Sequence, residues 1–137
     1  MSQLQPVVIV GGLRTPFVKS YTHYSSTNQE MLTETLNQLV DRFSIESVGE
    51  VVLGSITKAG TDWNLAREAV LGSKLDSSTP AFDLQRACGT SLSALVMVAN
   101  KIALGQIQSG IAGGSDSNTK VSLEFSRASS DKFIGLS

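Results

Sequence analysis

Cys88 is the residue whose type and setting are best suited to covalent chemistry. It is the only cysteine in the chain, and it lies between a predicted strand at 81–85 and a long apolar stretch that runs to about residue 104. A strand-to-helix junction of this kind places the thiol at a helix N-terminus, where the helix dipole and unpaired backbone N–H groups stabilise a thiolate. The thiolate is the nucleophilic form of cysteine. The pattern therefore predicts a nucleophile at the start of a helix.

The neighbours of Cys88 are compatible with this chemistry. Arg86 brings a positive charge close to the thiol, and Gly89 leaves the approach to the sulfur unobstructed. The backbone amides of the turn are suited to hold a developing oxyanion. A lone cysteine is, however, more often a small apolar side chain that fills a core. Position alone leaves both interpretations open.

Composition excludes several other classes of function. The chain has 137 residues, 11 Lys+Arg and 12 Asp+Glu, a net charge of −1, and no basic stripe that would bind nucleic acid. One His and one Cys give neither a metal-ligand spacing nor an internal disulfide. The longest apolar run, 95–99, is too short to span a bilayer, and no signal-peptide pattern is visible. We therefore expect a soluble cytoplasmic protein of one domain that needs no metal.

The elements that must position Cys88 alternate along the chain. Three helices are predicted. One follows a capping box formed by Thr27 and Glu30 and runs to Phe43, one covers 62–71, and one covers about 88–104. The third is apolar around its whole circumference, so we expect it to be buried. Four short segments predict strands, at 7–10, 51–54, 81–85 and 110–114. The continuous apolar run at 7–10 indicates a strand buried on both faces, and the run at 51–54 indicates a second buried strand.

The order of these elements, β-α-β-α-β-α-β, predicts an α/β fold. Strands that alternate with helices over short connections form a layered, mostly parallel sheet with right-handed crossovers and helices on both faces. In such sheets ligands bind where strands end and helices begin. Cys88 lies at one of these places.

Four segments resemble motifs of the thiolase family. They are an opening strand with an Arg-Thr-Pro turn at 8–17, Asn-x-Ala-Arg at 64–67, the nucleophile motif at 87–91, and Gly-Gly-x-Asp-Ser at 113–117, where the family usually has Gly-Gly-x-Glu-Ser. Because they occur in order at suitable separations, the resemblance is strong. It implies a partial thiolase-like N-terminal domain at 1–118 and the start of a loop region or a disordered end at 119–137.

The resemblance also implies an activity. In the family, the nucleophilic thiolate attacks the 3-keto carbonyl of a 3-ketoacyl-CoA, acetyl-CoA leaves, and coenzyme A takes the acyl group from sulfur; the reverse condensation is equivalent. Carried over to this chain, Cys88 is the catalytic nucleophile, and its own N–H helps to stabilise an oxyanion. Coenzyme A is then a substrate and no cofactor is bound, while the residues that would bind it stay unknown. The motif variants favour fatty-acid metabolism, and a homodimer or larger oligomer formed through this domain is implied for the full-length protein.

The chain also departs from the family. Thiolases need a His in a Gly-His-Pro segment and a second Cys that acts as acid and base, and this sequence contains neither. We therefore expect a truncated part that is inactive alone. Two alternatives remain open: a ketoacyl-synthase-like condensing enzyme, and a non-catalytic binding or assembly module that retains half of a thiolase fold.

A few other residues have structural explanations that we prefer to functional ones. His23 is a conceivable partner for Cys88, but a surface position is expected. Arg14 and Arg67 are arginines, a residue type that is commonly exposed. The resemblance alone suggests them as interface or ligand residues. Trp63 is expected in the core or at a subunit interface. The pairs Gly11-Gly12 and Gly113-Gly114 fit no phosphate-binding pattern, and close backbone packing explains them better.

Overall fold

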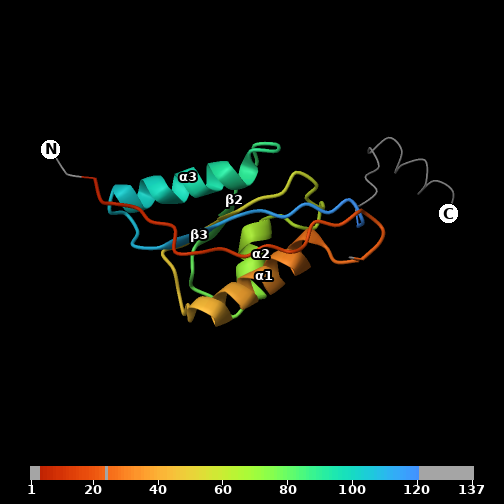
Figure 1. Ribbon diagram of the computed structural model, residues 1–137, viewed down its shortest axis with the longest axis horizontal. Coiled ribbons are helices and arrows are strands. Elements are labelled where there is room, and N and C mark those ends of the chain that lie inside the picture. The colour runs from red at the N-terminus through yellow and green to blue at the C-terminus, as the bar shows by residue number, and fades with distance from the viewer. Residues whose placement is uncertain (1–3, 24, 121–137) are drawn as a thin grey trace, which may run out of the picture.

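A computed structural model describes residues 4–23 and 25–120 of the chain (Figure 1). Within these residues, helices and strands alternate as the sequence predicts, but the order starts with a helix. The elements are α1 (Asn28–Phe43), β1 (Glu50–Leu53), α2 (Leu65–Leu71), β2 (Ala81–Asp83), α3 (Thr90–Ala103) and β3 (Gly110–Ala112). No helix in this part of the chain is long and apolar enough to cross a bilayer.

The strands form one parallel sheet in the order β2-β1-β3. The central strand β1 is the most buried of the three, and Val51 and Val52 are fully buried. Val51 pairs with Ala81 on one side and with Ile111 on the other. The parallel sheet predicted from the alternation of elements is therefore confirmed.

The helices cover both faces of this sheet, as predicted (Figure 1). Successive side chains of β1 point to opposite faces. Val51 and Leu53 belong to a core cluster with residues of α1 and α2, whereas Val52 packs with Ala94 and Val98 of α3. Each face thus has its own apolar core, and of the helices in the described residues α3 covers the face on which Val52 lies.

The predicted strand at 7–10 is wrong. This segment belongs to no strand, and Val8, Ile9 and Val10 are 78%, 75% and 82% exposed. Its β-branched composition predicts a strand, but a strand also needs a neighbouring edge to which it can hydrogen-bond. Here the nearest backbone bond runs from the N–H of Gln5 to the carbonyl of Ala103, at the end of α3, rather than to a strand.

The helix boundaries follow local capping. Thr27 and Glu30 form both hydrogen bonds of the predicted capping box, Thr27 N–H to Glu30 Oε2 at 2.7 Å and Glu30 N–H to Thr27 Oγ1 at 3.1 Å. The Thr27 N–H is the main cause that holds the pKa of Glu30 below its ordinary value. The helix predicted at 62–71 begins later, at Leu65, because Asn64 caps it by accepting the Arg67 N–H at 3.0 Å.

One prediction of burial is wrong in part and another is wrong. Trp63 is 88% exposed and precedes α2, so it is not a core residue, and its place at a subunit interface stays a prediction. The helix α3 is buried only on the side that faces the sheet. Its outer side exposes Leu92, Leu95 and Val96, because no described element covers that side. The end of the chain beyond residue 120 lies outside the described residues, so the predicted loop or disordered end is described only at 119–120.

Candidate active site

Cys88 lies in the turn between β2 and α3. The turn begins after Asp83 and ends at Thr90, the first residue of α3, and Gly89 occupies the N-cap position. The Cys88 side chain is exposed. Exposure contradicts the alternative that this cysteine is a small apolar residue filling the core, and it leaves the sulfur accessible at a helix N-terminus.

The turn is closed by hydrogen bonds within residues 86–90. The N–H of Gly89 donates to the carbonyl of Arg86 at 3.0 Å, and the N–H of Thr90 donates to that of Ala87 at 3.2 Å. These two amides are therefore occupied. They are not free to stabilise an oxyanion, contrary to the general expectation for the amides beside the thiol.

Three amides between Cys88 and Leu92 remain as donors. Among the described residues, the N–H groups of Cys88, Ser91 and Leu92 have no hydrogen-bond acceptor, whereas the N–H of Ser93 already bonds to the carbonyl of Gly89 at 2.9 Å. Unpaired amides of a first helical turn carry the positive end of the helix dipole. The arrangement can therefore stabilise negative charge on the sulfur or on an oxygen beside it.

Ala87, immediately before the thiol, has an unusual backbone conformation. Its φ is +44°, in the left-handed region that side-chain-bearing residues rarely adopt. For a residue other than glycine this conformation costs roughly 1–2 kcal/mol. Residues held in such a conformation are often found at functional sites, where the surrounding structure maintains them.

The turn packs closely against the ends of β1 and β3. A Cβ on Gly54 would overlap the carbonyl oxygen of Leu84 and Cγ2 of Thr90. A Cβ on Gly114 would lie 2.7 Å from the carbonyl oxygen of Gly54 and 2.8 Å from Ser91 Oγ. Close backbone packing explains Gly114, as expected. It also explains Gly54, a glycine that the sequence patterns did not single out.

Arg86 extends along α3. Its Nη1 is 3.4 Å from Ser93 Oγ, and its side chain helps to line a hollow of about 470 Å³ on the outer side of the helix. The remaining lining is largely apolar, with Leu92, Val96 and Leu104. The guanidinium thus contacts Ser93, and no hydrogen bond joins it to Cys88.

His23 and Cys88 are not brought together. Both side chains are exposed, and no hydrogen bond joins them. The loop of His23 instead contacts the other end of the described chain, where the N–H of Tyr21 donates to Thr119 Oγ1 at 3.2 Å. In the described ranges, no group of three or more His, Cys, Asp or Glu side chains lies close enough to hold a metal ion.

Comparison with known proteins decides the family. Residues 7–134 match the family model described as "Thiolase, N-terminal domain". This chain belongs to the thiolase family. Two curated relatives, the 3-ketoacyl-CoA thiolases of Shewanella piezotolerans and Shewanella frigidimarina, are each 35% identical to it, over 95% and 98% of this chain. The chain spans only 30% and 32% of their lengths.

A solved structure has the same fold. The acetyl-CoA acetyltransferase of Bacillus anthracis matches 76% of this chain, and 27% of its own, with a TM-score of 0.71 and 25% sequence identity. The layered α/β arrangement of sheet and helices is therefore that of the N-terminal part of a thiolase.

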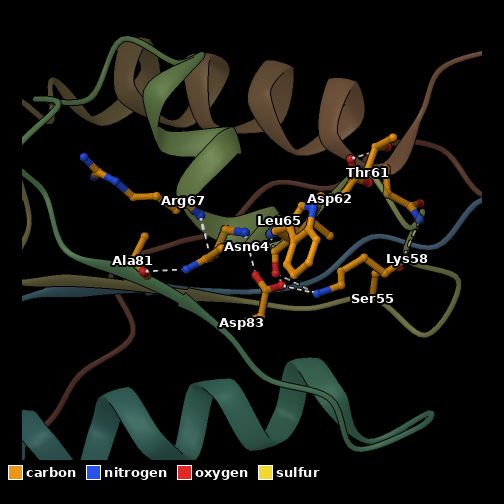
Figure 2. Close-up of polar contacts among 12 residues, drawn as sticks. Ser55, Lys58, Thr61, Asp62, Asn64, Leu65, Arg67, Ala81 and Asp83 are labelled. Atoms are coloured by element: carbon orange, nitrogen blue, oxygen red, sulfur yellow. Dashed lines mark hydrogen bonds and ion pairs between the residues drawn. The ribbon is translucent and has the colours of Figure 1, made fainter.

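The thiolase motif at 64–67 fixes the connection between α2 and β2. Asn64 caps α2 and reaches toward the carbonyl of Ala81 (Figure 2). The guanidinium of Arg67 donates to the carbonyls of Ser77 at 2.6 Å and Thr79 at 2.8 Å. Arg67 is thus engaged with the backbone that leads into β2. The other arginine that the resemblance suggested, Arg14, is exposed, and among the described residues its side chain hydrogen-bonds to the carbonyl of Thr15 at 3.4 Å.

Asp83, at the end of β2, is a structural residue that the sequence patterns did not reveal. Its carboxylate accepts the N–H groups of Leu65 and Ala66 at 3.0 and 2.7 Å, and Lys58 Nζ lies 2.9 Å away (Figure 2). It therefore joins the start of α2 to the strand that leads to Cys88. Because Asp83 and Leu65 are 18 residues apart, no local pattern signals this contact.

The acidic residue of the Gly-Gly-x-Asp-Ser motif has a comparable role. Asp116 Oδ1 accepts four hydrogen bonds, from Ser55 Oγ, Ile56 N–H, Thr57 N–H and Thr57 Oγ1, at 2.8–3.0 Å. Asn28, the first residue of α1, donates to Ser55 Oγ at 2.9 Å and to the carbonyl of Thr57 at 2.8 Å. We call Asn28, Ser55, Ile56, Thr57 and Asp116 the Asp116 junction. It connects the loops after β1 and β3 to α1.

Proposed function

We propose that Cys88 is the nucleophile of a thiolase-type acyl transfer. Its thiolate attacks the C3 carbonyl of a 3-ketoacyl-CoA, and the bond between C2 and C3 breaks. The acetyl-CoA enolate leaves and takes up a proton, and the shortened acyl group stays on the sulfur as a thioester. The thiolate of a second coenzyme A then takes this acyl group, and the Cys88 thiolate is restored. The reverse sequence is a condensation.

The observation that carries this proposal is the exposed Cys88 sulfur beside three unpaired amides. The N–H groups of Cys88, Ser91 and Leu92 have no acceptor in the described residues. Preorganised donors of this kind stabilise the charge that develops in acyl transfer. Family membership supports the substrate class, since the curated relatives are named 3-ketoacyl-CoA thiolases.

The complete reaction needs groups that these 137 residues do not supply. Thiolysis requires a base for the sulfur and an acid for the departing enolate. The sequence has one Cys and one His, and His23 is not joined to Cys88. We propose that the acid and base, and the segment that binds coenzyme A, belong to other residues of a longer polypeptide or to an added chain.

Association through this domain is also part of the proposal. The outer side of α3 exposes Leu92, Leu95 and Val96, and exposing about 300 Å² of apolar surface forgoes roughly 7 kcal/mol of burial. We propose that the full-length protein covers such surface within a homodimer or a larger oligomer. Sedimentation over a wide concentration range tests this: a compact monomer throughout, with no binding of hydrophobic dyes, contradicts it for this chain.

Thioester transfer tests the nucleophile. The chain is incubated with S-phenyl thioacetate and, separately, with acetyl-CoA, and its intact mass is measured. We expect one acetyl group on Cys88, released by hydroxylamine and absent from Cys88→Ala. Acetylation that persists in Cys88→Ala and resists hydroxylamine would place the modification on lysines, and it would contradict the proposed role of the thiol.

A further inference from the structure

The backbone around Cys88 depends on one buried hydroxyl. Thr90 is 5% exposed, and its Oγ1 makes two hydrogen bonds at once. It accepts the N–H of Arg86 at 2.8 Å and donates to the carbonyl of Ala87 at 2.7 Å. A threonine hydroxyl can act as donor and acceptor together. The hydroxyl therefore connects the two backbone groups that flank the left-handed residue Ala87.

These bonds determine the direction of an amide that matters for chemistry. The carbonyl of Ala87 and the N–H of Cys88 belong to the same peptide group, which is planar and trans. Thr90 holds that carbonyl twice, through its hydroxyl and through its N–H at 3.2 Å. The N–H of Cys88, one of the three unpaired donors, consequently points away from the interior of the turn.

We propose that Thr90 is a positioning residue for Cys88. Its hydroxyl holds Ala87 at φ +44° and thereby fixes the direction of the Cys88 N–H and the place of the sulfur at the start of α3. Thr90 itself contacts no substrate, because it is buried against Gly54. A contribution of Thr90 to catalysis rests on the proposed function of Cys88. The positioning of the Cys88 backbone and sulfur by Thr90 does not depend on that function.

Three variants separate the hydroxyl from the shape of the side chain. Thr90→Val keeps the shape and removes both bonds, and Thr90→Ser keeps the hydroxyl and removes the methyl group. Thr35→Val is the matched control, because the Thr35 hydroxyl bonds to the carbonyl of Met31 within α1, away from the turn. Circular dichroism and urea unfolding establish which variants are folded.

The decisive readout is the rate of Cys88 alkylation by iodoacetamide as a function of pH. We expect Thr90→Val to lower the rate by about tenfold and to displace its pH profile, since misplacement of a reacting group by a fraction of an ångström has effects of this order. Thr90→Ser and Thr35→Val are expected to stay within about threefold of the parent chain. A folded Thr90→Val with the rate and profile of the parent overturns the proposal.

Amide hydrogen exchange decides the matter if Thr90→Val does not fold. In the parent chain and in Thr90→Ser, we expect the Arg86 amide to be protected and the Ser91 amide to exchange freely. An unprotected Arg86 amide in the folded parent overturns the proposal. Neither readout uses a thioester, so failure of Thr90 as a positioning residue is distinct from failure of Cys88 to accept an acyl group.

Discussion

The Cys88 turn and the Asp116 junction both lie at the carboxyl ends of strands in the same sheet, yet their hydrogen bonding is opposite. At the junction, one carboxylate oxygen accepts four donors, and the Asn28 amide donates to two further oxygens. Between Cys88 and Leu92, three amides have no acceptor in the described residues, and Ala87 keeps a left-handed conformation.

This difference is what the proposed function of Cys88 requires. Polar groups that hydrogen-bond to one another stabilise a fold, but they leave no free donor or acceptor for a ligand. Unpaired donors and a strained backbone conformation contribute no stability. Both are often found at sites where a ligand or a developing charge is bound. The two regions touch through Gly54 and Gly114, so the junction can hold the turn in place.

The contact between the two regions is expected to be the most sensitive point. In Gly54→Ala, the new methyl group would overlap the Leu84 carbonyl and Thr90, so we expect a loss of about 3 kcal/mol or more in unfolding free energy. Gly12→Ala is the matched control, because nothing lies within 4 Å of its Cβ position. Urea unfolding measures both. Equal stabilities for the two variants would show that the close approach is not required.

Removing the carboxylate of the junction should cost less. In Asp116→Ala, four donors lose their acceptor, and partial exposure to water limits the loss to about 2 kcal/mol. Asp41→Ala is the control, since Asp41 makes only an exposed ion pair with Lys74 and should change stability by about 0.5 kcal/mol. If Asp116→Ala is as stable as Asp41→Ala, the junction is not the supporting region.

The smallest expected effect concerns the helix that carries Asn28. The Thr27 N–H lowers the pKa of Glu30, so the ionised carboxylate stabilises the folded state. This contribution is present above the ordinary value of 4.5 and is lost as the pH falls through the lower folded value. Urea unfolding at several pH values should therefore show parent and Glu30→Gln converging under acid conditions. A difference independent of pH would contradict this role.

Local sequence patterns predicted the helices and strands better than they predicted which strands pair with one another. The capping box of Thr27 and Glu30 and the buried strand β1 are encoded by residues close in sequence, and both are confirmed. The segment 7–10 has an equally clear strand composition, but it pairs with neither of the edge strands β2 and β3. Composition cannot specify a neighbour, and this is why that prediction failed.

The candidate site was predictable to a similar extent. The turn, the exposed thiol and the helix start follow from the residues around Cys88, and the family motifs indicate the chemistry. The supporting contacts were not predictable, because Asp116 and Ser55 are 61 residues apart and Asp83 and Ala66 are 17 apart. Arg67, by contrast, could be recognised as part of a motif. The sequence did not predict which backbone carbonyls its side chain binds.

Mixing the chain with a 3-ketoacyl-CoA and coenzyme A tests the account most directly. Acetyl-CoA release is followed over time, with Cys88→Ala as control and with or without the separately expressed C-terminal part of a 3-ketoacyl-CoA thiolase. Each missing acid or base typically costs about 10²–10⁴ in rate. We predict that the chain alone releases at most one equivalent, as acyl-Cys88 forms, and then stops. Sustained release by the chain alone, abolished in Cys88→Ala, would contradict the claim that the remaining catalytic groups come from outside this sequence.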